Sequence, residues 1–323
     1  MKKIVFLFLS IILIYTYYLK NNSSQEFETI NTELVSENIE VNSNINIDNF
    51  KNIKIGDSKE NVILNIGEPS RIDYSEYNFK WYVYNEDLNK FAMVGMDNDS
   101  VVAIYSNGID SNEIDIKLNS NKDDIRKVHN PLEYKKKGNT KYIINSDGQY
   151  DVFDIQKNYV TVFYDIHEDN KVCGYQIISK KAELTLDGIY PKASEELQES
   201  FEAQTKDLVN TERTKKNLNI LSFSKKATIS SRKHSEDMMI KNYFDHTNKD
   251  NKSPFDRMEA EGIDYKSAGE NIAAGQSSAI YAHHAWMNSL GHRKNILGDY
   301  KYIGVGVIFG GHYNIYYTQN FYT

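Results

Sequence analysis

Hydrophobic residues form one uninterrupted run near the start of the chain and return in periodic patterns from about residue 49 onward. The run spans residues 4–19 behind two lysines, an arrangement typical of an export signal or a membrane anchor. No clear cleavage site follows it, so residues 1–20 are interpreted as a signal peptide, a retained anchor or a buried N-terminal helix. Residues 21–48 are polar, acidic and without periodicity, which predicts a disordered tether.

Two stretches of the next region share one pattern and indicate an internal repeat. "IKIGDSKENVILNIGEP" begins at Ile53 and "IKLNSNKDDIRKVHNP" at Ile116, and apolar residues and a lysine recur at matching positions. Each copy predicts a short extended entry, one short amphipathic helix and a proline that ends it. The expected helix caps are Asp57 or Ser58 in the first copy and Ser120 or Asn121 in the second.

Strand-like runs follow each copy of the repeat and are separated by polar turns. They are residues 79–85, 91–96 and 100–106 after the first copy, and 140–146, 159–166 and 171–179 after the second. Residues 49–180 are therefore expected to form an α+β domain of two helix-plus-antiparallel-strand repeats. This region shows no catalytic constellation, and His129 and His167 are interpreted as isolated surface or turn residues.

The pattern becomes helical after a linker at residues 181–194. Helical spacing of apolar residues recurs in residues 194–217, 224–244, 253–262 and 277–291. Gly291 is expected to end the last of these helices. "YIGVGVIF" and "HYNIYYTQNF" follow, joined by Gly310 and Gly311, and predict a hairpin with a two-residue turn. Residues 195–323 are thus expected to form a second domain.

The composition narrows the possible functions. The chain of 323 residues is long enough for two hydrophobic cores. Its net charge of -7 leaves no basic surplus to neutralise phosphates, so nucleic acid is not expected as a partner. Cys173 is the only cysteine of the sequence, which excludes an intramolecular disulfide and any site of several thiolates. An exported chain of this kind must hold its fold by packing alone, which suits a bacterial envelope.

Local catalytic signatures are missing, and the candidate chemistry rests on three dispersed residues of the second domain. His246 lies in "YFDHT", Glu270 in the glycine-rich connector "AGENIAAG" and His292 in "SLGHRKNIL". Each follows a predicted helix or lies in a connector, where side chains project into a cleft. Two histidines and a carboxylate suit Zn²⁺, or a pair in which the carboxylate orients one imidazole. On spacing alone, a joint site and three independent structural residues both remain open.

The other histidines of this half are interpreted as structural. We expect a solvated pair on the fourth helix (His283 and His284), a half-buried helix contact (His234) and an exposed residue after the hairpin turn (His312). Asn271 and Asn295 are expected to fix their loops by hydrogen bonds from side chain to backbone.

A series of short motifs occurs in one order between residues 200 and 323. The motifs are "HSEDM", "YFDHT", "SPFDRM", "GENIAAG", "AWMNSLGHRKNIL", "IGVGV" and "YYTQNF". Together they closely resemble the bacterial branch of the CAP superfamily, which comprises cysteine-rich secretory proteins, antigen 5 and pathogenesis-related proteins. Residues 49–180, with "IGDSKENVILNIGEP" and "YVTVFYD", resemble the accessory domain found ahead of CAP domains in Firmicute envelope proteins.

The resemblance implies an α-β-α sandwich with a central antiparallel sheet for the second domain. The family's cleft is lined by two histidines and two glutamates, and His246, Glu270 and His292 match three of these positions. The second glutamate is expected three residues after Trp286, where this chain has Ser289 instead. Because family members bind a divalent cation usually through the two histidines, the resemblance implies His246 and His292 as ligands of zinc or another divalent cation.

No single reaction unites the family, so the resemblance leaves three interpretations of function open. The first is an exported, non-enzymatic binding module that holds a metal or a small ligand in the His246–Glu270–His292 cleft. The second is a metal-dependent peptidase or wall-modifying hydrolase, in which the cation activates water and Glu270 is the base. The third is a structural envelope or spore-associated protein. The expected location is extracellular or at the cell surface, with residues 4–19 available for membrane attachment, and the expected partner is a cell-wall, lipid or protein ligand.

Overall fold

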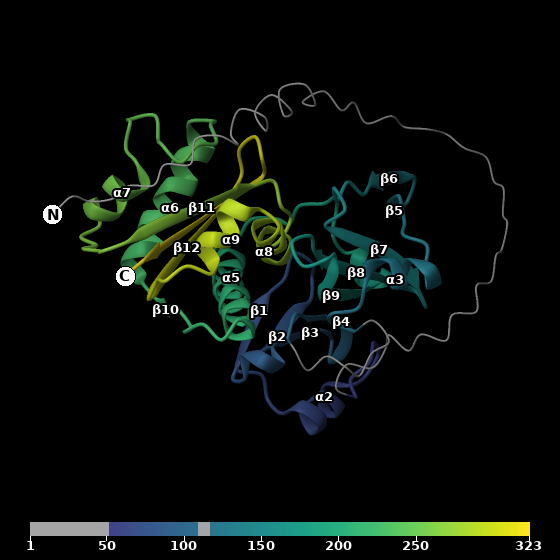
Figure 1. Cartoon of the computed structure of the whole chain (residues 1–323). Coiled ribbons are helices and arrows are strands. Elements are labelled where there is room, and N and C mark those ends of the chain that lie inside the picture. The colour runs from purple at the N-terminus through teal and green to yellow at the C-terminus, as the bar shows by residue number, and fades with distance from the viewer. Residues whose placement is uncertain (1–51, 109–116) are drawn as a thin grey trace.

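The computed structural model describes residues 52–108 and 117–323 (Figure 1). The signal or anchor expected at residues 1–20 and the tether expected at residues 21–48 lie outside the described residues. Two large sheets, each with helices against it, make up most of the described chain (Figure 1). Among the described helices, none is both long enough and apolar enough to cross a membrane.

The first sheet has seven antiparallel strands in the order β1-β2-β3-β4-β9-β8-β7. Its strands are β1 (Arg71–Tyr74), β2 (Lys80–Tyr84), β3 (Ala92–Asp97), β4 (Ser100–Ser106), β7 (Tyr150–Ile155), β8 (Asn158–Asp165) and β9 (Lys171–Ser179). The accompanying elements are α2 (Lys59–Ile66), η1 (Leu88–Lys90), α3 (Lys122–Val128), β5 (Tyr134–Lys137), β6 (Thr140–Ile143) and α4 (Lys180–Glu183). The two copies of the repeat join where β4 pairs with β9.

The predicted repeat is confirmed in three dimensions. Each helix follows a residue that forms a single β-bridge to the last strand of its copy. Ser58, before α2, bridges to Ser100 at the start of β4. Asn121, before α3, bridges to Lys171 at the start of β9. Both helices lie on the same face of the sheet, where Val62 and Ile125 enter one core. The run at residues 140–146 is the exception, because β6 pairs only with β5 in a small, largely exposed hairpin and β7 takes its expected place in the sheet.

The second sheet has four strands in the order β10-β12-β13-β11, antiparallel except for the two-residue β10. Its strands are β10 (Ser222–Phe223), β11 (Ala268–Ala274), β12 (Tyr302–Phe309) and β13 (Ile315–Tyr322). The helices of this half are α5 (Glu195–Lys215), α6 (Lys225–Ile240), α7 (Pro254–Ala260), α8 (Ala279–Met287) and α9 (Leu290–Ile296). α6 covers one face of the sheet, and α5 and α8 lie on the other side, which confirms the α-β-α sandwich (Figure 1).

The "IGVGV" motif lets α6 approach β12 very closely. A Cβ atom at Gly304 would lie 2.2 Å from the backbone of Ala227, and one at Gly306 would lie 2.1 Å from the backbone nitrogen of Arg232. Ser231 Oγ also donates to the Gly304 carbonyl at 3.2 Å. The glycines are therefore required because backbone meets backbone at this helix–sheet contact.

Two of the predicted boundaries in this half are wrong. The fourth predicted helix is two helices, since α8 ends at Met287 and α9 begins at Leu290, so Gly291 lies inside α9 and does not end a helix. The hairpin turn is longer than two residues, because residues 310–314 separate β12 from β13 and the Gly310 N–H donates to Asn314 O across it.

One of the hydrophobic clusters contains residues from both halves of the chain. The face of the first sheet opposite α2 and α3 carries Trp81, Tyr105 and Phe163, and these side chains pack with Leu208 of α5 and Ile280 of α8. The α5–α8 layer thus lies between the two sheets and belongs to both cores.

Candidate functional site

Glu270 lies on an edge strand, and this corrects the expectation that "AGENIAAG" is a loop. β11 pairs with β13 on one side, while its outward carbonyls accept side-chain hydrogen bonds on the other. Trp286 Nε1 donates to Ile272 O at 3.0 Å, and Asn295 Nδ2 donates to Glu270 O at 3.1 Å. These donors from α8 and α9 cover the edge and fix the strand that carries Glu270. A Cβ atom at Gly269 would lie 2.6 Å from the Tyr300 hydroxyl, so the strand needs a glycine there.

The Glu270 carboxylate is buried and charged at the same time. Its side chain is 1% exposed, His246 Nδ1 lies 2.9 Å from Oε1, and Arg257 Nη2 lies 2.6 Å from Oε2. Burial pushes the pKa of Glu270 upward, but the hydrogen bond from His246 and the charge of Arg257 outweigh it and hold the pKa below its usual value. Glu270 is therefore an ionised carboxylate with a donor on each oxygen.

Arg257 is a site residue that the sequence analysis missed. Its guanidinium binds Glu270 and also donates through Nη1 to the carbonyls of His246 (2.8 Å) and Lys252 (2.9 Å). α7 starts with a capping box of Ser253 and Asp256, which places Arg257 in the first turn of the helix. The only signal in the sequence was its position in the "SPFDRM" motif.

The hydrogen bond to Glu270 fixes the orientation of the His246 imidazole. A carboxylate can only accept, so Nδ1 donates to Glu270. The His246 side chain is 36% exposed. His246 is thus held through Nδ1, and Nε2 is the ring nitrogen left to contact a ligand.

His234 lies beneath the same carboxylate and is more deeply buried than expected. Its side chain is 0% exposed, and Nε2 is 3.8 Å from Glu270 Oε1 and 3.1 Å from Asp245 O. Burial lowers the pKa of His234 to about 4, although the charge of Glu270 acts in the opposite direction. His234 is therefore a neutral part of the site floor.

His292 lies on α9, on the other side of the site. Asn271 Nδ2 donates to His292 O at 3.2 Å, as expected from the sequence, and accepts through Oδ1 from Asn295 at 2.9 Å. Burial and then the charge of His246 lower the pKa of His292 to about 4, so the two imidazoles lie within electrostatic reach of each other. Among the described residues, no hydrogen-bond partner meets the buried His292 Nδ1 atom.

The structure thus joins His246 directly to Glu270, and hydrogen bonds of Asn271 and Asn295 attach α9, which carries His292, to the strand of Glu270. The position of the absent second glutamate, Ser289, is the N-cap of α9. Within residues 52–108 and 117–323, no three histidine, cysteine, aspartate or glutamate side chains are grouped so as to hold a metal ion. A cation here would have two imidazoles as its protein ligands, which is a chemically suitable but incomplete donor set.

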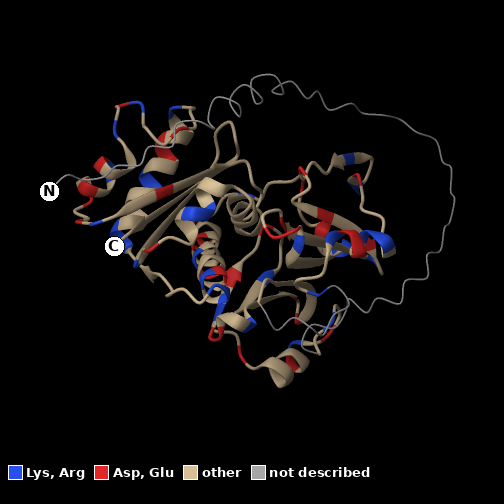
Figure 2. Cartoon of the chain, in the orientation of Figure 1, with Lys and Arg blue, Asp and Glu red and all other residues tan. Residues whose placement is uncertain are grey.

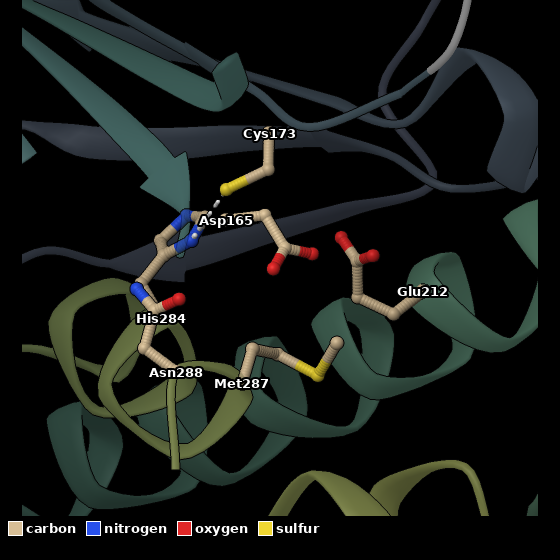
Figure 3. A pocket seen from close by; sticks show the side chains of 6 residues that line it. All are labelled: Asp165, Cys173, Glu212, His284, Met287 and Asn288. Atoms are coloured by element: carbon tan, nitrogen blue, oxygen red, sulfur yellow. Dashed lines mark hydrogen bonds between the residues drawn. The ribbon is translucent and has the colours of Figure 1, made fainter. Parts of the chain in front are cut away.

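His283 and His284 are buried, not solvated as expected, and His284 contacts the first half of the chain. His284 stacks on Phe163 with ring centroids 3.9 Å apart, and its Nε2 atom lies 3.1 Å from the Tyr105 hydroxyl. Figure 3 shows His284 beside Cys173, with Nδ1 3.6 Å from Sγ, at a small cavity between the halves. The sequence could not predict the burial of His284, because it lies on a face of α8 that would be exposed to solvent in the second half alone and that the first sheet covers. His129 is also buried, against Phe153, whereas His312 is exposed as expected.

Comparison with known proteins places the chain in a family. The family described as the cysteine-rich secretory protein family (CAP) matches residues 206–321, and the CAP-associated N-terminal family matches residues 55–188. Membrane protein YlbC of Bacillus subtilis is 30% identical over 289 residues, which cover 83% of this chain and 82% of YlbC. The chain belongs to the CAP family.

Three further proteins are similar to this CAP protein. YkwD of Bacillus subtilis is 47% identical over 113 residues, covering 35% of this chain and 44% of YkwD. An extracellular protein with an SCP domain from Bacillus anthracis has a TM-score of 0.73 and 26% identity over 90% of this chain and 99% of that one. A Staphylococcus aureus cysteine-rich secretory protein, at a TM-score of 0.69 and 18% identity over 83% of this chain and 91% of that one, shares the fold. The matches therefore cover between 35% and 90% of this chain.

Proposed function

We propose that this CAP protein is an exported, non-enzymatic binding module of the bacterial cell surface, with the His246–Glu270–His292 cleft as its binding site. The names of its relatives support the location, since YlbC is a membrane protein and the Bacillus anthracis structure is an extracellular protein. The apolar run at residues 4–19 would export or anchor the chain.

One observation favours binding over hydrolysis, namely that both oxygens of Glu270 already have partners. A general base needs a free oxygen within reach of the proton that it takes. In Glu270, Oε1 accepts from His246, Oε2 accepts from Arg257, and the side chain is 1% exposed. A carboxylate held in this way orients and charge-balances His246, and it is poorly placed to activate water.

His246 and His292 would hold a divalent cation such as Zn²⁺, because Glu270 orients the imidazole of His246 and burial keeps that of His292 neutral at neutral pH. The orphaned His292 Nδ1 atom supports this fit within the described chain. A bound cation would supply a Lewis acid to which an anionic group of the ligand attaches. Figure 2 shows Lys, Arg, Asp and Glu interspersed over the described elements.

Calorimetric titration of the full-length chain with Zn²⁺ tests the proposal. We expect binding in the wild type, loss of binding in His246→Ala/His292→Ala, and about tenfold weaker binding in Glu270→Gln, which leaves His246 without its orienting carboxylate. His312→Ala is the matched control, because it removes an exposed histidine far along the chain from the cleft.

Three results would contradict parts of this proposal. Absence of Zn²⁺ binding in the wild type would remove the metal. Turnover of peptides or peptidoglycan fragments that disappears in Glu270→Gln would establish the hydrolase instead. If Glu270→Gln lowers only the melting temperature, the residues serve stability alone.

A further inference from the structure

A turn of the first half of the chain holds the junction between α8 and α9. Residues 166–170 connect β8 to β9 and lie against Asn288, the residue after α8. Asn288 Oδ1 accepts from the Ile166 N–H at 3.1 Å, and Asn288 Nδ2 donates to Tyr164 O at 2.9 Å. His167 Nε2 lies 3.0 Å from Asn288 O and must donate, since a carbonyl only accepts. One junction residue thus makes three hydrogen bonds to the other half of the chain.

An ion pair strengthens the same contact from α9. Arg293 Nη2 lies 2.8 Å from Asp165 Oδ2 and 3.3 Å from Glu168 Oε1, and Nη1 donates to Met287 O. The side chains of Arg293 and Asp165 are only 11% and 13% exposed. A charge-assisted hydrogen bond sheltered in this way fixes the position of both partners more firmly than a surface pair does. Arg293 directly follows His292 in the chain.

The start of α9 depends on these contacts because the helix is poorly fixed by itself. α9 has seven residues, and its N-cap Ser289 makes no side-chain cap bond. On its other side, the helix is attached to β11 through Asn271 and Asn295. α9 therefore spans from the first half of the chain to β11, the strand of Glu270, with His292 in its first turn.

We propose that the CAP-associated half positions His292 in the cleft through a junction clamp, formed by Asp165 and His167 on one side and Asn288 and Arg293 on the other. Asn288 and Arg293 are positioning residues in this view. Supporting groups of this kind hold a site residue within a fraction of an ångström of its working geometry. A test of the clamp by Zn²⁺ affinity rests on the proposed function, whereas a test by the NMR signal of the His292 ring does not.

The test compares full-length variants altered only on the first-half side of the clamp. Asp165→Ala/His167→Ala removes the shorter Arg293–Asp165 ion pair and the side-chain donor to the Asn288 carbonyl, and His167→Gln keeps an N–H donor at that position. Arg71→Ala is the matched control, because it breaks a second ion pair between the halves, Arg71 with Asp207 at 2.8 Å, away from the junction. The readouts are the His292 ring Cε1–Hε1 NMR cross-peak at fixed pH and the affinity for Zn²⁺.

We expect the His292 cross-peak to shift or broaden in Asp165→Ala/His167→Ala and to stay in place in Arg71→Ala and His167→Gln. The affinity for Zn²⁺ is expected to fall about tenfold in the clamp variant only. An unmoved His292 cross-peak in a folded clamp variant, or an equal shift in Arg71→Ala, would overturn the clamp. A shifted cross-peak in a protein that binds no Zn²⁺ even as wild type would support the clamp and contradict the cation instead.

Discussion

Glu270 shows how a single carboxylate can be buried without losing its charge. Two donors reach it from different elements, His246 from the segment after α6 and Arg257 from α7. Arg257 also binds the His246 carbonyl, so the same side chain fixes the carboxylate and the backbone of its histidine partner. The charge at this position therefore maintains the orientation of His246.

The site residues in recognisable motifs could be predicted from the sequence. Arg257, whose role depends on how α7 packs against β11, could not. His246, Glu270 and His292 stand in "YFDHT", "GENIAAG" and "SLGHRKNIL". The structure joins His246 to Glu270 and attaches the helix of His292 to the strand of Glu270. In the sequence, Arg257 cannot be distinguished from an ordinary exposed arginine on a helix. Its role follows only from the direction in which α7 approaches β11, which no local pattern encodes.

Buried neutral histidines predict an acid-sensitive fold. Burial lowers the pKa of His283 from 6.5 to about 4, with Glu212 acting against the shift and Lys215 and Arg293 adding to it. In the unfolded chain the same group binds a proton near pH 6.5, so its stabilising effect is complete above pH 6.5 and is lost as the pH falls toward 4. The slope from one such group is about 1.4 kcal/mol per pH unit.

Urea unfolding between pH 7.5 and pH 4.5 would measure this effect. We expect His283→Gln to reduce the steepness of the wild-type decline by about that slope, while His312→Gln, which alters an exposed histidine, leaves it unchanged. Equal slopes in the wild type and His283→Gln would show that His283 is not held neutral by the fold.

At the scale of elements, the periodic spacing of apolar residues predicted the helices well, but it did not predict the edge strand β11 or the boundary between α8 and α9. The repeat of α2 and α3, and helices α5, α6 and α7, follow from apolar spacing and capping residues. β11 could not be recognised as a strand, because Ala and Gly dominate it and its stability comes from β13 on one side and side-chain donors on the other. The break between α8 and α9 was misplaced because a glycine near a helix end usually marks that end.

Two glycine substitutions should change stability in opposite directions. Gly291 lies inside α9 with no heavy atom near its missing Cβ, so Gly291→Ala is expected to stabilise the chain by about 0.4–1 kcal/mol. A Cβ atom at Gly306 would lie 2.1 Å from the α6 backbone, so Gly306→Ala is expected to cost about 1–3 kcal/mol or more. Thermal and urea unfolding of the two variants provide the comparison. A destabilised Gly291→Ala would favour a helix end at Gly291.

At the scale of the whole molecule, the α5–α8 layer packs against both sheets. Leu208 and Ile280 pack on the first sheet, while Phe201 and Trp286 of the same helices pack on the second. Hydrogen bonds between the halves, such as that from Asn107 to Glu212 at 3.0 Å, add polar contacts around this core. A sequence pattern shows which residues are apolar but not which of two cores each one enters.

Substitution within this layer should therefore destabilise both sheets together. Ile280→Ala removes a fully buried side chain and is expected to cost about 2–5 kcal/mol, with a single calorimetric transition and faster hydrogen exchange in both β3 and β13. Leu184→Ala is the control, since that side chain is 62% exposed and its loss should change stability by less than about 0.5 kcal/mol. Two separate transitions, or faster exchange in β3 alone, would show that the halves fold independently.

Because α5 and α8 pack on both sheets, their residue types can separate CAP sequences with a companion domain from those without one. A CAP domain that stands alone has water where this chain has the first sheet, so its outer positions on these helices should be polar. The positions of Leu208, Ile280, Tyr281 and His284 carry side chains suited to a covered surface here. The residue types at these four positions in other CAP chains should therefore distinguish the domains that evolved beside a companion domain from those that evolved alone.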